Sequence, residues 1–175
     1  GTSDWVICHV PFKKTDIFHG IGTILSGIPG RYFAINEQEI AGGALSFLRD
    51  KILYHKDELL REEAVPDVYK IFDRMVENVP AGSNNLIFTP WLIGERSPVD
   101  DHTIRGGIYN LSLEMSREHL IRAIFEGVAY NIKWLFIYLE KLIQKRKIKD
   151  TPGMSKKDIV IPEVRMIGGG ANSKI

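Results

Sequence analysis

The chain has 175 residues, of which 44% are hydrophobic and 26% charged, and this composition is typical of one soluble globular domain. Its net charge of +1 argues against a dedicated nucleic-acid-binding protein, and no apolar run is long enough to cross a membrane. The single cysteine, Cys8, excludes an internal disulfide framework and a multi-cysteine metal site, so we expect a cytoplasmic protein.

The beginning of the chain predicts two strands separated by a loop. Residues 5–10 alternate weakly between apolar and polar side chains, as in a strand. Glycine and proline punctuate residues 11–30, which therefore predict a loop. Residues 31–36 predict the second strand.

Two helices are expected next. Between Gln38 and about Tyr54 the apolar residues recur at helical spacing, and residues 65–80 repeat this pattern over a shorter stretch. The pair Gly42 and Gly43 lies early in the first helix, where each glycine costs roughly 1 kcal/mol relative to alanine. We therefore expect close packing or a ligand at this glycine pair.

The middle of the chain predicts two short extended segments around a charged loop. Residues 86–92 are typical of a buried strand, and residues 93–105 form the predicted loop. Residues 106–113 predict a further short strand or an extended arm.

The longest helix is predicted over residues 117–144, because its apolar residues follow a three-four spacing. Ser116 suits the N-cap, and Glu118 places a negative charge in the first turn. The Thr-Pro-Gly sequence of residues 151–153 breaks the pattern and predicts an exposed loop. Residues 159–167 predict the last strand, so strands and helices alternate as in an α/β protein.

Two segments suit a phosphate group. Gly168-Gly169-Gly170-Ala171-Asn172 follows the last predicted strand, and its glycines let the backbone approach a ligand where a helix start offers free N–H groups. Gly1-Thr2-Ser3 precedes the first predicted strand. Each segment also has an ordinary interpretation, as a packing turn for the first and as a turn or a cloning remnant for the second.

The loop from Glu95 to Asp101 is a third candidate. It follows the predicted strand 86–92, and ligands in open α/β sheets bind beyond the carboxyl ends of strands. Carboxylates near a nucleotide could hold waters bound to Mg²⁺, while solvated charges or a local ion pair are the alternative interpretation. Within the long helix, Gly127 is expected to let another element pack closely.

Taken together, these segments resemble the FGGY family of carbohydrate kinases, and most closely its xylulose-kinase-like members. The resemblance runs in order and spacing through nearly the whole chain, over residues 1–3, 94–98, 105–107 and 168–173. The family's second signature looks matched from Gly106 to Glu126, except at Asn110, where the signature usually has glycine.

The resemblance implies the C-terminal part of a two-domain kinase with an actin-like, ribonuclease H-like ATPase fold, in which helices flank a mixed sheet. Residues 1–175 would be most of the nucleotide-binding domain, truncated at its C-terminus and without the N-terminal sugar-binding domain. By this analogy Gly1, Thr2 and Ser3 contact the terminal phosphates of ATP. Gly168, Gly169, Gly170 and Ala171, with Asn172, line the adenosine and α-phosphate site.

The resemblance also implies ATP and Mg²⁺ as cofactors and a small-molecule sugar as substrate. The catalytic base is expected to be an aspartate upstream of this chain, so no catalytic residue and no metal ligand is assigned within it. The leading reaction is the phosphorylation of D-xylulose to xylulose 5-phosphate, ahead of ribulose, gluconate and glycerol. We expect the full-length protein to carry out this reaction and the fragment by itself to be inactive.

Two other interpretations stay open at this point. One is a non-catalytic actin-like nucleotide-binding or regulatory module. The other is a plain Rossmann-type nucleotide binder, which fits less well because the triple-glycine turn comes at the end of the chain and not after the first strand. No nucleic-acid or membrane partner is expected, and a homodimer is compatible with the sequence.

Overall fold

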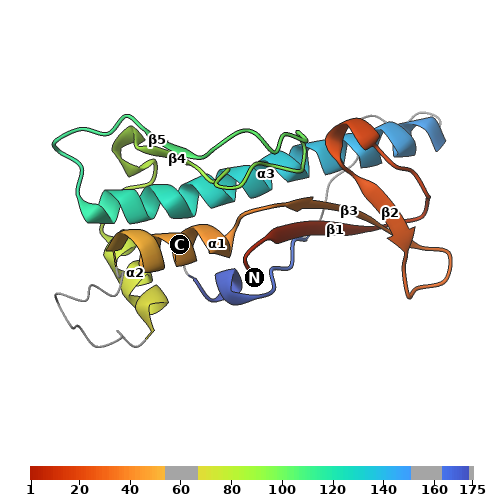
Figure 1. The fold of residues 1–175 in the computed structure, drawn as a ribbon. Coiled ribbons are helices and arrows are strands. Elements are labelled where there is room, and N and C mark those ends of the chain that lie inside the picture. The colour runs from red at the N-terminus through yellow and green to blue at the C-terminus, as the bar shows by residue number, and fades with distance from the viewer. Residues whose placement is uncertain (54–66, 151–162, 174–175) are drawn as a thin grey trace.

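The computed structural model shows an α/β domain arranged along one long helix, α3, Arg117–Asp150 (Figure 1). It describes residues 1–53, 67–150 and 163–173. The N-terminal boundary of α3 is the predicted one, and Ser116 accepts a backbone hydrogen bond from Leu120 N at 3.2 Å. None of the helices in the described ranges is long and apolar enough to cross a membrane.

A three-stranded antiparallel sheet lies along one side of α3. Its strands are β1, Asp4–Val10, β2, Gly22–Leu25, and β3, Tyr32–Gln38, in the order β1-β3-β2. In β1 and β3, Asp4 lies opposite Gln38 and Val10 lies opposite Tyr32. The predictions for β1 and β3 are thus confirmed, and β3 extends two residues further than predicted.

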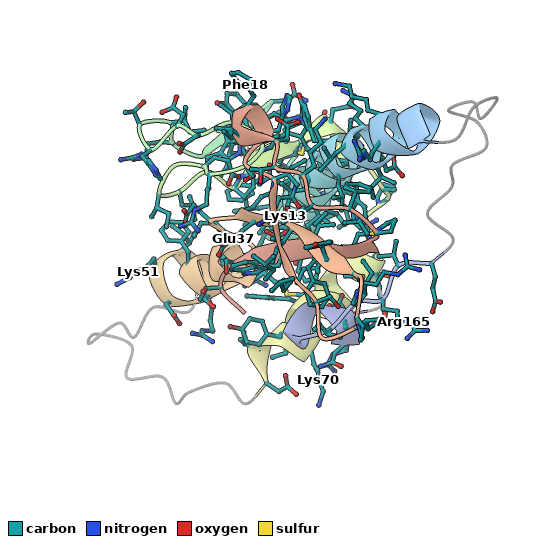
Figure 2. All side chains as sticks on the ribbon, turned by 90° about the vertical axis from the view of Figure 1, so that its right-hand side faces the viewer. Lys13, Phe18, Glu37, Lys51, Lys70 and Arg165 are labelled. Carbon is teal, nitrogen blue, oxygen red and sulfur yellow. The ribbon has the colours of Figure 1, made fainter. Side chains whose placement is uncertain are left out.

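Strand β2 was not predicted, because the sequence indicated a loop over residues 11–30. The strand is only four residues long, and it begins at a glycine, so it shows no clear alternation. Pairing with β3 stabilises the extended conformation of β2, which the local sequence alone does not indicate. The connection before β2 contains a 3₁₀ turn, Ile17–His19, from which the 90% exposed Phe18 projects (Figure 2).

A second antiparallel pair crosses the opposite side of α3. It consists of β4, Ile87–Thr89, and β5, Gly107–Tyr109. Both strands are shorter than the predicted segments 86–92 and 106–113. Pro90 follows β4 directly, and proline cannot donate to a strand ladder.

The helices α1, Gly42–Phe47, and α2, Val68–Glu77, lie beside the N-terminal half of α3. A π-helical segment, Leu48–Leu53, continues α1 without a break. The helix predicted from Gln38 therefore begins later, because β3 continues to Gln38. Two short 3₁₀ turns complete the described elements, Ser83–Asn85 and Gly169–Asn172.

Two separate apolar cores follow the length of α3. The sheet packs on its C-terminal half through Val6, Val10, Phe12, Ile21, Ala34, Leu135, Leu139, Leu142 and Ile143. The helices α1 and α2 and strand β4 pack on its N-terminal half through Ala44, Leu48, Val68, Phe72, Val76, Leu86, Phe88, Ile121, Ala123 and Ile124. The long helix thus fixes the sheet relative to the smaller helices.

The strand predicted over residues 159–167 is wrong for its described part. Residues 163–167 belong to no strand, and residues 159–162 lie outside the described residues, as does the predicted loop 151–153. Apolar patterning predicts extension but does not supply a partner strand. All strand pairs in the described ranges are antiparallel, so the expected mixed sheet is seen here only in its antiparallel part.

Candidate functional site

The Gly1-Thr2-Ser3 segment lies against the start of α1. The carbonyl oxygen of Thr2 accepts hydrogen bonds from Ala41 N at 2.7 Å and from Gly43 N at 3.1 Å. A Cβ atom on Gly42 would lie 2.5 Å from the carbonyl oxygen of Gly1. The expected close packing at Gly42 and Gly43 is therefore confirmed, and the close neighbour is the N-terminal segment.

The glycine-rich turn from the far end of the chain reaches the same place. Gly168 has a φ of +95°, which favours glycine, and a Cβ atom on it would lie 3.9 Å from Gly1 N. Figure 1 shows the segment that carries Gly169–Asn172 running beside the N-terminus. The fold thus brings together the two segments that the sequence predicted as nucleotide-binding loops.

Space is left in front of this turn. Added Cβ atoms on Gly169 and Gly170 would meet no atom of the described residues within 4 Å, and both glycines are exposed. Small residues of this kind let backbone N–H groups approach an anion, and the hydroxyl groups of Thr2 and Ser3 add donors. The two segments therefore place small residues and exposed backbone at one position of the fold.

Glu95 lies in a buried polar cluster with Gln38 and Asn131. It is only 1% exposed. Its Oε1 accepts hydrogen bonds from Glu39 N at 3.2 Å and Arg96 N at 2.9 Å, and its Oε2 accepts one from Asn131 Nδ2 at 2.8 Å. Glu95 is therefore neither a solvated charge nor the ion-pair partner of the Arg96 side chain.

The guanidinium group of Arg96 pairs with two other glutamates. It lies 2.5 Å from Glu37 Oε2 and 2.8 Å from Glu39 Oε1. Glu37 comes from β3, in the middle of the molecule (Figure 2). This pairing ties the Glu95 loop to the end of β3, and sequence reasoning missed it because the partners are remote in the chain.

Asp4 is a further acidic side chain near Glu95. Both of its carboxyl oxygens are buried, and no other residue that the structure describes donates a hydrogen bond to them. Oε1 of Gln38, which lies opposite Asp4 in the sheet, is likewise buried without a partner among the described residues. Burial, followed by the nearby charge of Glu95, raises the pKa of Asp4 from 3.8 to about 7, and Glu37 adds to this rise. No local sequence signal indicates this, because the burial is set by tertiary structure.

The rest of the loop is held by its own polar groups. Asp101 Oδ1 accepts hydrogen bonds from Thr103 N at 2.7 Å and Thr103 Oγ1 at 2.6 Å, and these bonds lower the pKa of Asp101. Asp100 pairs with His102 at 3.3 Å. Among the residues that the structure describes, no group of three or more His, Cys, Asp or Glu side chains is arranged to hold a metal ion.

The whole chain matches the model of the C-terminal domain of the FGGY family of carbohydrate kinases, over residues 1–175. The chain belongs to the FGGY family. This confirms the resemblance seen in the sequence.

Relatives of this FGGY chain include kinases for different sugars. The xylulose kinase of Bacillus subtilis (strain 168) is 35% identical over 132 residues, which cover 75% of this chain and 24% of that protein. The gluconokinase of Bacillus licheniformis is 30% identical over 184 residues, which cover 91% of this chain and 36% of that protein. The chain thus spans about a third or less of the length of these relatives.

Solved structures agree with this assignment. The crystal structure of xylulose kinase from Rhodospirillum rubrum is similar with a TM-score of 0.66 and 26% identity, over 82% of this chain and 26% of that one. The fold class is therefore confirmed as the α/β, actin-like and ribonuclease H-like fold of FGGY kinases.

Asn110 is the departure from the second FGGY signature, which usually has glycine there. Its φ is 63°, in the left-handed region that favours glycine, and it directly follows β5. Asparagine is one of the few other residues that adopt this conformation readily. The turn geometry that glycine would give is therefore kept, and Asn110 Nδ2 adds a hydrogen bond of 3.3 Å to Asn85 O.

Gly127 confirms the expected close approach within the signature. A Cβ atom at this position would clash with the carbonyl oxygen of Phe88 in β4, at a distance well under 3.0 Å. The glycine therefore lets β4 lie directly on α3. Its role is structural, as the sequence indicated.

Proposed function

We propose that this chain forms most of the C-terminal, nucleotide-binding domain of a two-domain sugar kinase, which transfers the terminal phosphoryl group of ATP to a sugar hydroxyl. The observation that carries the proposal is the meeting of Gly1-Thr2-Ser3 with Gly168–Asn172, from opposite ends of the chain. The membership of the chain in the FGGY family supports the same reaction.

In this proposal Gly1, Thr2 and Ser3 contact the terminal phosphates, and Gly168–Asn172 line the adenosine and α-phosphate positions. Backbone N–H groups and small hydroxyls suit this task, because they can follow charge as it moves onto the transferred phosphoryl group. Mg²⁺ binds few carboxylates beside substrate phosphates and keeps several waters, so it would enter with the nucleotide.

The acceptor side of the reaction lies outside this chain. The sugar hydroxyl oxygen attacks the terminal phosphorus, the bond to ADP breaks, and the hydroxyl proton passes to an aspartate upstream of Gly1. We assign no catalytic base within the chain. We further propose that the sugar binds mainly to the N-terminal domain and that the protein works in the cytoplasm.

Xylulose is the substrate that we propose first. A xylulose kinase is the more identical of the two relatives above, at 35% against 30% for the gluconokinase. Gluconate, ribulose and glycerol are the competing acceptors. No observation favours a non-catalytic regulatory module, since the relatives are named as kinases.

The test is an ADP-release assay on the full-length protein with ATP, Mg²⁺ and each of xylulose, ribulose, gluconate and glycerol. We expect turnover that depends on one sugar, with xylulose giving the highest kcat/KM, and no turnover by residues 1–175 in isolation. Tight ATP binding without turnover on any sugar would overturn the proposal in favour of the regulatory module.

A further inference from the structure

We propose that Glu95 is a positioning residue. It holds the Gly1-Thr2-Ser3 segment in place through residues 39–41, the turn that precedes α1. The inference rests on the proposed function, because it assigns Glu95 to the nucleotide side of that reaction. Glu95 itself is buried and touches no substrate in this account.

The first step is the anchoring of Glu95 to the long helix. Asn131 of α3 donates to Glu95 Oε2 at 2.8 Å, and it is itself 5% exposed. Asn131 is fixed by two further bonds, since its Oδ1 accepts from Trp91 Nε1 at 3.4 Å and its carbonyl accepts from Gln38 Nε2 at 2.9 Å. The glutamate is therefore anchored to the middle of α3.

Second, Glu95 is connected to the N-terminal segment through the backbone of residues 39–43. Glu95 Oε1 accepts from Glu39 N at 3.2 Å, at the point where β3 leaves the sheet. Two residues later Ala41 N donates to the carbonyl oxygen of Thr2 at 2.7 Å, and Gly43 N donates to the same oxygen at 3.1 Å. Glu95 thus fixes the backbone that in turn fixes Thr2.

The third step concerns the charge beneath the segment. Asp4 follows Ser3 directly, its carboxyl oxygens are buried and accept no hydrogen bond from another described residue, and Glu95 contributes to its raised pKa. Glu37, from β3, acts in the same direction, and the Arg96 guanidinium pairs with Glu37 and Glu39. Glu95 therefore influences both the position of Thr2 and the protonation of Asp4.

A carboxylate suits position 95 because both of its oxygens accept hydrogen bonds. The three groups that bond to it, Glu39 N, Arg96 N and Asn131 Nδ2, are all donors. Glutamine at this position has the same shape but replaces one acceptor oxygen by an NH₂ group, which would face a donor. Glu95→Gln is therefore a small change that disturbs the hydrogen bond between the side chains of residues 95 and 131.

The test is steady-state kinetics on full-length Glu95→Gln. We expect KM for ATP to rise about tenfold, which corresponds to the loss of one hydrogen bond to a charged group, while KM for the sugar stays within about twofold. We also expect the pH dependence of KM for ATP to move to lower pH, because Asp4 loses the negative charge that raises its pKa.

The matched control is Glu126→Gln. Glu126 is a largely buried glutamate, 14% exposed, that accepts hydrogen bonds from Gly82 N at 2.9 Å and Arg122 Nε at 2.7 Å, and neither donor belongs to the residues that hold Thr2. We expect this variant to lose thermal stability with both KM values unchanged. The positioning role is wrong if Glu95→Gln raises both KM values by the same factor. It is also wrong if Glu95→Gln leaves both KM values unchanged, which is the result expected for Glu126→Gln.

Two further measurements keep the proposal testable. If Glu95→Gln does not fold, Asn131→Ala removes one anchor and leaves the carboxylate, and we expect the same selective rise in KM for ATP, by about threefold. If the wild-type protein turns over no sugar, the proposed reaction fails, and calorimetric titration with ADP takes the place of kinetics. An ADP affinity of Glu95→Gln equal to that of the wild type would then overturn the positioning role.

Discussion

The side-chain amide of Asn131 donates a 2.8 Å hydrogen bond to the carboxylate of Glu95, and both side chains are almost fully buried. This contact joins the middle of α3 to the loop that follows β4. We expect Asn131→Ala to lower the free energy of unfolding by about 1–3 kcal/mol, because it leaves a buried acceptor unsatisfied. Thermal melting of the full-length protein measures this, with the neighbouring Tyr130→Ala, at a 58% exposed position, as the control. Equal melting temperatures for the two variants would contradict the role of the contact.

Gly127→Ala tests the contact between α3 and β4. A Cβ atom would clash with the carbonyl oxygen of Phe88, which is backbone and cannot swing away. We expect a loss of about 2–3 kcal/mol of stability by chemical denaturation, as for other overpacked sites. Gly27→Ala is the control, because a Cβ atom there meets no described atom within 4 Å. Its stability should remain within about 0.5 kcal/mol of the wild type.

Asp4→Asn tests the buried carboxyl. The folded protein binds the Asp4 proton more tightly than the unfolded chain, since the pKa is raised from 3.8 to about 7. This contribution to stability is complete below pH 4 and is lost as the pH rises to about 7. Asn cannot ionise, so we expect the variant to gain about 1–2 kcal/mol over the wild type between pH 4 and pH 8, after allowance for partial exposure to water. Denaturation curves of both proteins at pH 4 and pH 8 measure this. The same stability difference between the variant and the wild type at the two pH values would show that Asp4 has an ordinary pKa.

Asn110 permits a comparison of two substitutions at one site. Its φ of 63° suits glycine, and its side chain contributes one exposed hydrogen bond to Asn85 O. We expect Asn110→Gly to change the stability by less than about 0.5 kcal/mol, and Asn110→Ala to cost about 1 kcal/mol, because alanine pays the left-handed penalty. Equal unfolding midpoints for the two variants would mean that this backbone conformation carries no strain.

The elements with strong local signals could be predicted from the sequence. The three-four spacing and Ser116 fixed the start of α3, and the alternation of residues 5–10 indicated β1. The glycines at positions 42, 43 and 127 were expected at close contacts, and the structure places a backbone carbonyl beside each of them. The two elements are decided by neighbours in the chain, whereas at the glycines the sequence indicates a close contact but not its partner, which is Gly1, Thr2 or Phe88.

The remaining features depend on distant parts of the chain. Strand β2 exists because β3 offers it a partner, and the predicted strand over 163–167 has none in the described structure. The burial of Glu95 follows from its bonds to Glu39 and Asn131, which are far from it in sequence, so a charged loop residue became the centre of a polar cluster. Burial of this kind also raises the pKa of Asp4, which no spacing rule indicates.

The most direct test of the account is the effect of Gly169→Val on the two KM values of the full-length protein. The added side chain meets no atom of the described residues within 4 Å of its Cβ, so it fills the space that we assign to the nucleotide without disturbing the fold. We predict that KM for ATP rises at least tenfold, while KM for the sugar and the melting temperature match those of Gly27→Val, which also points into open space. An unchanged KM for ATP would contradict the assignment of Gly168–Asn172 to the nucleotide site.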